Sequence, residues 1–244
     1  MINKQLDLAG KVALVVGGGG EGIGGYTSRA LAEAGAAVVV ADLNDAALDA
    51  ARAMLRQTPA KWAMLLADVT REEVIASLVY GALEKFGRID ILVNVAGGTN
   101  ASSWGPMTDK TSAQWDTTQA LNLKYCYLTG TRVARHLQEA HRGGAIVNIA
   151  SMSAYSAPYH AAYGAAKAGL IALTRSMAVE WAAHGIRVNA ISPGSIDTPR
   201  SRLRLTEERL RQYKEVIPLG RKGRPDEIAS VVLFLVSDLA SYVT

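Results

Sequence analysis

A tyrosine and a lysine four positions apart are the strongest chemical signal in the sequence. Tyr163 and Lys167 occur in the segment YGAAK, and on a helix this spacing places both side chains on one face. An isolated tyrosine has a pKa of about 10 and is a poor base at neutral pH. A cation about 4 Å away supplies roughly the 4 kcal/mol that lowers this pKa to about 7. The pair predicts a centre for proton transfer, although an exposed tyrosine beside a lysine has the same spacing.

A glycine-rich run, VVGGGGEGIGG at residues 15–25, follows the first apolar stretch. Glycines at a helix N-terminus let an anion reach the backbone N–H groups without meeting a Cβ atom. The run lacks the Gly-Lys-Ser/Thr ending of a P-loop, so it favours a dinucleotide over a mononucleotide. Three glycine spacings fit such a loop: Gly17/Gly19/Gly22, Gly20/Gly22/Gly25 and Gly18/Gly22/Gly24.

An acidic residue stands where a dinucleotide site uses one. Asp42 ends the second apolar run about 20 residues after Gly22, where a carboxylate accepts hydrogen bonds from the adenosine ribose. The same carboxylate would repel a 2′-phosphate, and Glu21 adds a second negative charge in the glycine run. Both acids favour NAD over NADP. The alternative role of Asp42 is to cap the following helix.

Six short, β-branched apolar runs alternate with longer segments of helical spacing. Runs of this kind are typical of buried parallel strands. The alternation predicts an α/β fold, a three-layer doubly wound parallel sheet that binds ligands at the carboxyl ends of its strands. The runs are residues 11–16, 36–42, 63–69, 90–97, 144–151 and 186–194.

Composition excludes several classes of protein. The 244 residues carry no linker or repeat, so we expect a single domain, 1–244. No run reaches the roughly 18 apolar residues of a membrane span. The start lacks a secretory signal and the single cysteine, Cys126, has no partner for an internal disulfide, which favours the cytoplasm. The charge of +4 is spread along the chain, so no nucleic acid is expected. No metal site is predicted.

Taken in order, the motifs resemble those of the short-chain dehydrogenase/reductase (SDR) family over essentially the whole chain. The matching residues are Gly18/Gly22/Gly24, Asp68-Val69, NVAG (94–97), Asn122, Ser151, YGAAK and PGSIDTP (193–199). The resemblance implies a Rossmann fold of about seven parallel strands. It also implies NAD(P)-dependent interconversion of alcohols and ketones.

The resemblance assigns four catalytic residues. Tyr163 would exchange a proton with the substrate oxygen, and Lys167 would lower the pKa of Tyr163 and hold the nicotinamide ribose. Ser151 would donate a hydrogen bond to the substrate oxygen, and Asn122 would position a water that links Lys167 to solvent. Ser153 is the alternative candidate for this role, but the spacing of Ser151 from Tyr163 fits the family better.

The resemblance also implies a set of cofactor contacts and three departures from the family. Gly17 stands where the family has a threonine, and Val95 stands where the family has the second residue of an Asn-Asn pair. The chain stops at Thr244, and we expect the family's C-terminal strand and tail to be absent. The Val95 change is expected to loosen a contact between strands. The cofactor contacts are Gly18, Glu21, Gly22, Ile23, Gly24, Asp42, Leu43, Asp68, Val69, Asn94, Ala96, Gly97, Tyr163, Lys167, Pro193, Gly194, Ile196 and Thr198.

Segments after the last three runs are expected to form the substrate pocket, with a lid at about 195–220. Its residues would be Trp104, Met107, Ser153, Tyr155 and Tyr159. An aromatic cleft favours a medium-sized hydrophobic alcohol or ketone, while the basic lid leaves open an acidic substrate such as an acyl thioester. Helices near 122–139 and 163–181 resemble a family interface, which implies a homodimer or homotetramer.

The expected function is therefore an NAD-dependent oxidoreductase that interconverts a secondary alcohol and a ketone. Two alternatives stay open at this stage. One is a 3-oxoacyl-thioester reductase, which Asp42 disfavours because such reductases commonly use NADPH. The other is a non-catalytic NAD-binding regulatory protein, which would have no need for the Ser151/Tyr163/Lys167/Asn122 set.

Overall fold

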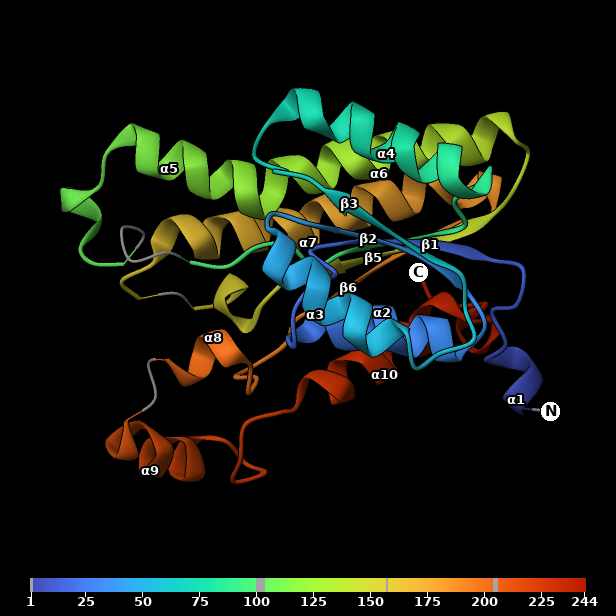
Figure 1. Cartoon of the computed structure of the whole chain (residues 1–244). Coiled ribbons are helices and arrows are strands. Elements are labelled where there is room, and N and C mark those ends of the chain that lie inside the picture. The colour runs from blue at the N-terminus through green and yellow to red at the C-terminus, as the bar shows by residue number, and fades with distance from the viewer. Residues whose placement is uncertain (1, 100–103, 157, 204–205) are drawn as a thin grey trace.

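A computed structural model describes residues 2–99, 104–156, 158–203 and 206–244. In these residues a parallel sheet is covered by helices on both faces, which confirms the α/β prediction (Figure 1). The strands are β1 (Val12–Val16), β2 (Ala37–Asp42), β3 (Trp62–Leu66), β4 (Ile91–Asn94), β5 (Gly144–Ile149) and β6 (Ile186–Ile191). The helices are α1 (Ile2–Gln5), α2 (Ile23–Glu33), α3 (Asp45–Leu55), α4 (Glu72–Phe86), α5 (Ser112–Gln119), α6 (Tyr125–Glu139), α7 (Ala161–Trp181), α8 (Pro199–Arg202), α9 (Glu207–Val216) and α10 (Pro225–Val236).

The strand order is β3-β2-β1-β4-β5-β6, and every pair is parallel. The chain builds outward from β1 through β2 and β3, then returns to place β4 on the other side of β1. The connections that follow β1 and β4 therefore run in opposite directions along the sheet. Val16 and Asn94 pair at the carboxyl ends of these two strands. A reversal of this kind opens a crevice for a ligand at the edge of the sheet.

The described residues form six strands, not the seven or so that the family resemblance implies, and several strands end earlier than their apolar runs. β3, β4, β5 and β6 stop at Leu66, Asn94, Ile149 and Ile191. The residues that follow these strand ends continue as loops. These loops carry most of the expected site residues.

Two apolar layers fix the sheet between its helices. Leu14, Leu92 and Ile146 face a core shared with α4, α6 and α7, while Val15, Val40 and Val93 face a core shared with α2, α3 and α10. Figure 1 shows these two groups of helices on opposite faces of the sheet. Because alternate residues of each strand face opposite layers, both faces need apolar side chains, which explains the near-continuous apolar runs.

A short π-helical turn, residues Ala120–Lys124, joins α5 to α6. Asn122 lies in this turn and is fully buried. Turns of this kind widen a helix locally and are frequent at functional sites. In the described residues no helix is long and apolar enough to cross a membrane.

Candidate active site

Two adjoining hollows lie at the carboxyl ends of the strands, with volumes of about 810 Å³ and 240 Å³. Ile23, Val95, Gly97 and Thr198 border both, so the hollows form one continuous cleft. The larger hollow contains the glycine loop and the end of β2, and the smaller contains Ser151, Tyr163 and Lys167. Of the expected cofactor residues, all but Gly18 and Asn94 line this cleft.

The glycine loop is shaped by close backbone contacts. Gly17 has a φ of +77°, and a Cβ atom there would lie 2.4 Å from the backbone nitrogen of Ala96. A Cβ atom on Gly24 would lie 1.8 Å from the carbonyl oxygen of Gly17, so α2 could not pack so closely on the loop. Gly18 faces away from the cleft and packs on Val15 and Ser28. The loop therefore requires a glycine at position 17 for steric reasons. The replacement of the family's threonine does more than remove one hydrogen bond.

The N-terminus of α2 is open toward the cleft. Gly22 precedes the helix with no side-chain cap, and the first helical hydrogen bond runs from Tyr26 N–H to the Gly22 carbonyl, 3.2 Å away. Only the Thr198 methyl group comes within 4.0 Å of a Cβ placed on Gly22. The first-turn N–H groups of an 11-residue helix are therefore available to an anion. These features fit the pyrophosphate of a dinucleotide.

Asp42 lies at the cleft and does not cap a helix. Asn44 caps α3 by accepting the N–H of Ala47 at 2.9 Å, which leaves Asp42 free of that role. The Asp42 carboxylate accepts the N–H groups of Gly19 at 2.9 Å and Leu43 at 2.8 Å, one on each oxygen. Each oxygen retains further capacity to accept a hydrogen bond from a ribose hydroxyl.

Asn94 does not line the cleft, and its contact with the cofactor stays a prediction. Its side chain is 1% exposed, donates to Asn148 at 2.9 Å and accepts from Thr129 at 2.9 Å. Asn148 in turn donates to Thr174 of α7 at 2.9 Å. This chain of hydrogen bonds connects β4 and β5 to each other and to α6 and α7. The two strands therefore keep a polar contact even though Val95 replaces an asparagine.

Ser151, Tyr163 and Lys167 meet in the smaller hollow. Ser151 follows β5, while Tyr163 and Lys167 share a face of α7, as the spacing predicts. The Ser151 oxygen accepts the N–H of Ser153 at 3.1 Å, and the Ser151 hydroxyl acts to lower the pKa of the Tyr163 phenol. The hydroxyl of Ser153 pairs with His160 at 3.3 Å and does not border the hollow, so the structure favours Ser151 over Ser153.

The hydrogen bond of Lys167 goes to the backbone and not to the phenol of Tyr163. Its ammonium donates to the Ile149 carbonyl at 2.7 Å and lies 5.8 Å from the centre of the Tyr163 ring. Burial raises the pKa of Tyr163, against smaller lowering effects of the Ser151 hydrogen bond and the Arg200 charge. Burial lowers the pKa of Lys167 to about 8.

Asn122 holds the loop after β4. Its side-chain oxygen accepts the N–H of Gly98 at 2.8 Å, and its nitrogen donates to the carbonyls of Gly98 at 3.1 Å and Thr118 at 3.0 Å. A Cβ atom on Gly97 would lie 2.7 Å from the Asn122 oxygen and 3.3 Å from the Lys167 nitrogen. Asn122 thus adjoins Lys167 without lining the cleft, and its role in a water relay stays a prediction.

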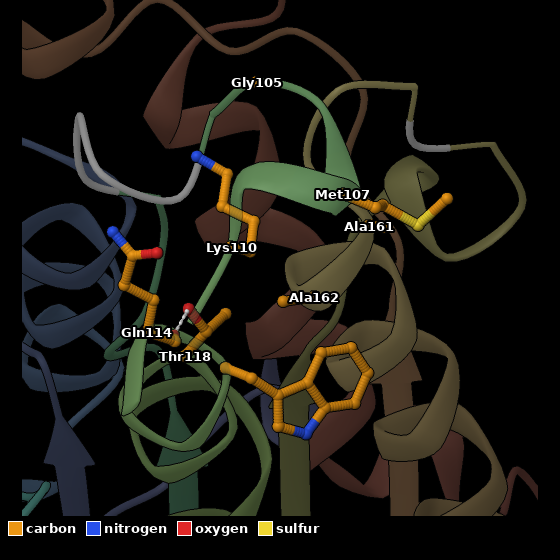
Figure 2. Close-up of a pocket in the computed structure, with 8 residues that line it drawn as sticks. Gly105, Met107, Lys110, Gln114, Thr118, Ala161 and Ala162 are labelled. Carbon is orange, nitrogen blue, oxygen red and sulfur yellow. Dashed lines mark hydrogen bonds between the residues drawn. The ribbon is translucent and has the colours of Figure 1, made fainter. Parts of the chain in front are cut away.

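The expected aromatic substrate pocket is not assembled. Tyr155 and Tyr159 are 76% and 69% exposed and line neither hollow. Met107 borders a separate cavity of about 110 Å³ between the segment around Lys110 and the start of α7 (Figure 2). Residues 100–103 and 157 of the expected pocket and 204–205 of the expected lid lie outside the described residues.

Two residues near Tyr163 were not singled out from the sequence. His160 lies between Trp104 and Tyr163, with ring centres 4.4 Å and 6.0 Å away. Arg200 of α8 reaches across the cleft to the carbonyls of Gly97, at 3.3 Å, and Thr99. Only the count of basic residues in the lid pointed to Arg200, because a sequence does not show which of them turns inward. In the described residues no cluster could hold a metal ion.

Both the sequence and the fold match known proteins. A family model described as enoyl-(acyl carrier protein) reductase matches residues 18–244. The chain is 41% identical over 230 residues to cis-4-hydroxycyclohexanecarboxylate dehydrogenase of Sinomonas cyclohexanicum, covering 94% of this chain and 90% of that one. It is 38% identical over 238 residues to 3-oxoacyl-(acyl-carrier-protein) reductase of Thermotoga maritima, covering 97% and 94%. The structure of 7α-hydroxysteroid dehydrogenase with NADH and 7-oxo glycochenodeoxycholic acid matches with a TM-score of 0.92 at 34% identity, covering 98% and 92%.

A parallel sheet with a glycine loop at its point of reversal defines a Rossmann-type nucleotide-binding protein. The chain belongs to the short-chain dehydrogenase/reductase family, whose members matched here are oxidoreductases.

Proposed function

We propose that this protein is an NAD-dependent oxidoreductase that interconverts a secondary alcohol and a ketone. The observation that carries the proposal is the meeting of Ser151, Tyr163 and Lys167 in a hollow that continues into the dinucleotide-shaped cleft. A protein that only sensed a nucleotide would not need a half-buried phenol and a buried ammonium at the end of the cleft. The bound nicotinamide would supply hydride transfer.

In this proposal Tyr163 moves the proton and Ser151 holds the substrate oxygen. In alcohol oxidation the Tyr163 phenolate takes the proton of the substrate hydroxyl, and in ketone reduction the phenol returns it. Ser151 donates a hydrogen bond to the same oxygen and stabilises negative charge that develops there. Since burial raises the pKa of Tyr163, the phenol stays protonated in the free protein, and a positive charge brought by the oxidised cofactor favours its ionisation.

The preference for NAD rests on the position of Asp42. Its carboxylate lines the larger hollow at the end of β2, where the adenosine of a dinucleotide lies in a Rossmann fold. Glu21 lines the same hollow, so two acidic side chains would oppose a 2′-phosphate. Support also comes from the 7α-hydroxysteroid dehydrogenase structure, which contains NADH.

The substrate class is a secondary alcohol or its ketone. The relative from Sinomonas acts on a ring alcohol and the structural relative binds a ketosteroid, as their names state. The alternative of a 3-oxoacyl-thioester reductase is favoured by the match to the Thermotoga reductase.

A substrate panel tests the proposal. Secondary alcohols, hydroxysteroids and 3-hydroxyacyl thioesters are offered with NAD⁺ or NADP⁺, and formation of the reduced cofactor is followed by absorbance. We expect turnover of a secondary alcohol with NAD⁺. Turnover of thioesters alone with NADP⁺ would support the alternative, and tight NADH binding without turnover of any member would support a regulatory protein.

We also propose that the protein is cytoplasmic and forms a homodimer or homotetramer through α6 and α7. Tyr127 of α6 and Val179 of α7 are 50% and 81% exposed, an unusual exposure for large apolar side chains on long helices. Light scattering coupled to size-exclusion chromatography tests the assembly. A monomer at micromolar concentration would contradict it.

A further inference from the structure

Arg200 differs from the other basic residues around it. Arg202, two positions later on α8, donates to the Asp197 carboxylate at 3.0 Å, and Lys222 lies 3.5 Å from the same carboxylate. Arg221 and Arg224 likewise pair with carboxylates of α10. Within the described residues, the hydrogen bonds of Arg200 go to the neutral carbonyls of Gly97 and Thr99. Its positive charge is therefore not neutralised by a carboxylate there.

The guanidinium of Arg200 lies beside the reacting groups. A Cβ atom on Gly98 would lie 2.6 Å from a guanidinium nitrogen of Arg200, and one on Gly97 would lie 3.3 Å from the ammonium of Lys167. The two cations thus flank consecutive glycines at the junction of the hollows. The charge of Arg200 also acts on the phenol of Tyr163.

The contacts of Arg200 place its guanidinium at the loop after β4, on Gly97, which borders both hollows. Arg200 itself lines the larger hollow, at this junction with the smaller one. An anion held by Arg200 would therefore lie beside Gly97 and Gly98, next to the ammonium of Lys167. A guanidinium presents paired N–H donors that match the two oxygens of a carboxylate. A substrate carboxylate could replace the backbone carbonyls as the hydrogen-bond partner of Arg200, and the two opposite charges would then be buried together.

We propose that Arg200 binds the carboxylate of a hydroxy acid or keto acid substrate and so selects acidic over neutral alcohols. This inference rests on the proposed function and narrows its substrate class. Arg200 is part of the substrate site, so its loss should weaken binding of the anion more than it slows the chemical step.

Matched neutral and acidic probes test the inference. Wild-type protein and Arg200→Met, Arg200→Lys and Arg202→Met variants are assayed with 3-hydroxybutyrate and 4-hydroxycyclohexanecarboxylate, and with the carboxamide of each. We expect wild type to prefer a carboxylate. Arg200→Met should lower kcat/KM at least tenfold for the carboxylate, mainly through KM, and less than threefold for the carboxamide. Arg200→Lys should retain part of the preference, and Arg202→Met should change neither value more than threefold.

A binding measurement gives a readout that does not depend on turnover. Calorimetric titration of cyclohexanecarboxylate into the NADH complex should show a Kd at least tenfold weaker for Arg200→Met than for wild type, with cyclohexanecarboxamide unaffected. Equal losses for acidic and neutral probes, or a loss confined to NADH binding, would overturn the role of Arg200 while leaving the proposed function intact. Failure of wild type to bind the carboxylate would overturn the role of Arg200 alone, and failure to oxidise any panel alcohol would overturn the proposed function and the inference that rests on it.

Discussion

The ammonium nitrogen of Lys167 lies 5.8 Å from the centre of the Tyr163 ring, and its hydrogen bond goes to the carbonyl of Ile149, 2.7 Å away. The lysine is 2% exposed, so its charge is held in a poorly hydrated place by one backbone carbonyl. The buried charge therefore costs folding free energy. A buried, weakly compensated charge is typical of functional sites.

The free energy of unfolding should reveal this cost. Burial lowers the pKa of folded Lys167 to about 8, below its ordinary value of 10.5, so between these pH values the unfolded chain binds more protons and stability rises with pH. Lys167→Met removes the titration. Between pH 7 and pH 10.5 the free energy of unfolding of wild type should therefore rise by roughly 3 kcal/mol relative to that of the variant. Urea unfolding of both proteins measures this difference, and a difference that is independent of pH would contradict the pKa.

Substitution of Gly17 should disrupt the glycine loop. Gly17→Ala forces an L residue to a φ of +77° and places its Cβ atom 2.4 Å from Ala96 nitrogen, whereas Gly20, with a φ of +69°, has open space around it. We expect a loss of about 3 kcal/mol or more for Gly17→Ala and about 1 kcal/mol for Gly20→Ala in urea unfolding. Equal losses would mean that the contact with Ala96 is unimportant.

Asn94 should act on stability and not on cofactor binding. Asn94→Ala leaves Asn148 and Thr129 with unpaired buried groups, which should cost about 2 kcal/mol. The Kd for NADH should change less than threefold, because the side chain does not border the cleft. A tenfold weaker Kd with unchanged unfolding would support the sequence-based prediction for this residue.

Asp42 should determine the choice of cofactor. Asp42→Asn removes the charge and keeps an oxygen to accept the Gly19 N–H. The ratio of kcat/KM for NAD⁺ to that for NADP⁺ should fall at least tenfold, since removing one charge near a phosphate is worth more than about 1 kcal/mol at a partly buried site. Steady-state kinetics with both cofactors measure this ratio, and a wild-type preference for NADP⁺ would refute the argument.

The parts of the site that were predictable from sequence are those set by local chain geometry. The spacing of Tyr163 and Lys167 on α7, and the loops after β1, β2 and β5, follow from helical periodicity and from apolar runs that end at polar residues. These patterns placed most cofactor residues on the observed cleft.

Side-chain directions in loops and lids were not predictable in this way. Tyr155, Tyr159 and Met107 were expected in the pocket from their apolar character, but they are exposed and do not line the hollow that contains Tyr163. The hydrogen bond from Asn94 to Asn148 was not predicted because only the structure brings Asn148, 54 residues later in the chain, beside it. The contact of Arg200 with Gly97 spans 103 residues and depends in the same way on tertiary structure.

The most direct test of the proposed function is the rate of NADH formation by Tyr163→Phe, with Tyr155→Phe as a matched control. Both changes remove one phenolic hydroxyl, but Tyr155 is exposed and outside the cleft. With the best alcohol of the panel and saturating NAD⁺, Tyr163→Phe should lower kcat at least about 100-fold, with an unchanged Kd for NADH, and Tyr155→Phe should stay within twofold of wild type. Turnover by Tyr163→Phe at the rate of the wild-type protein would contradict the assignment of Tyr163 as the proton-transfer residue.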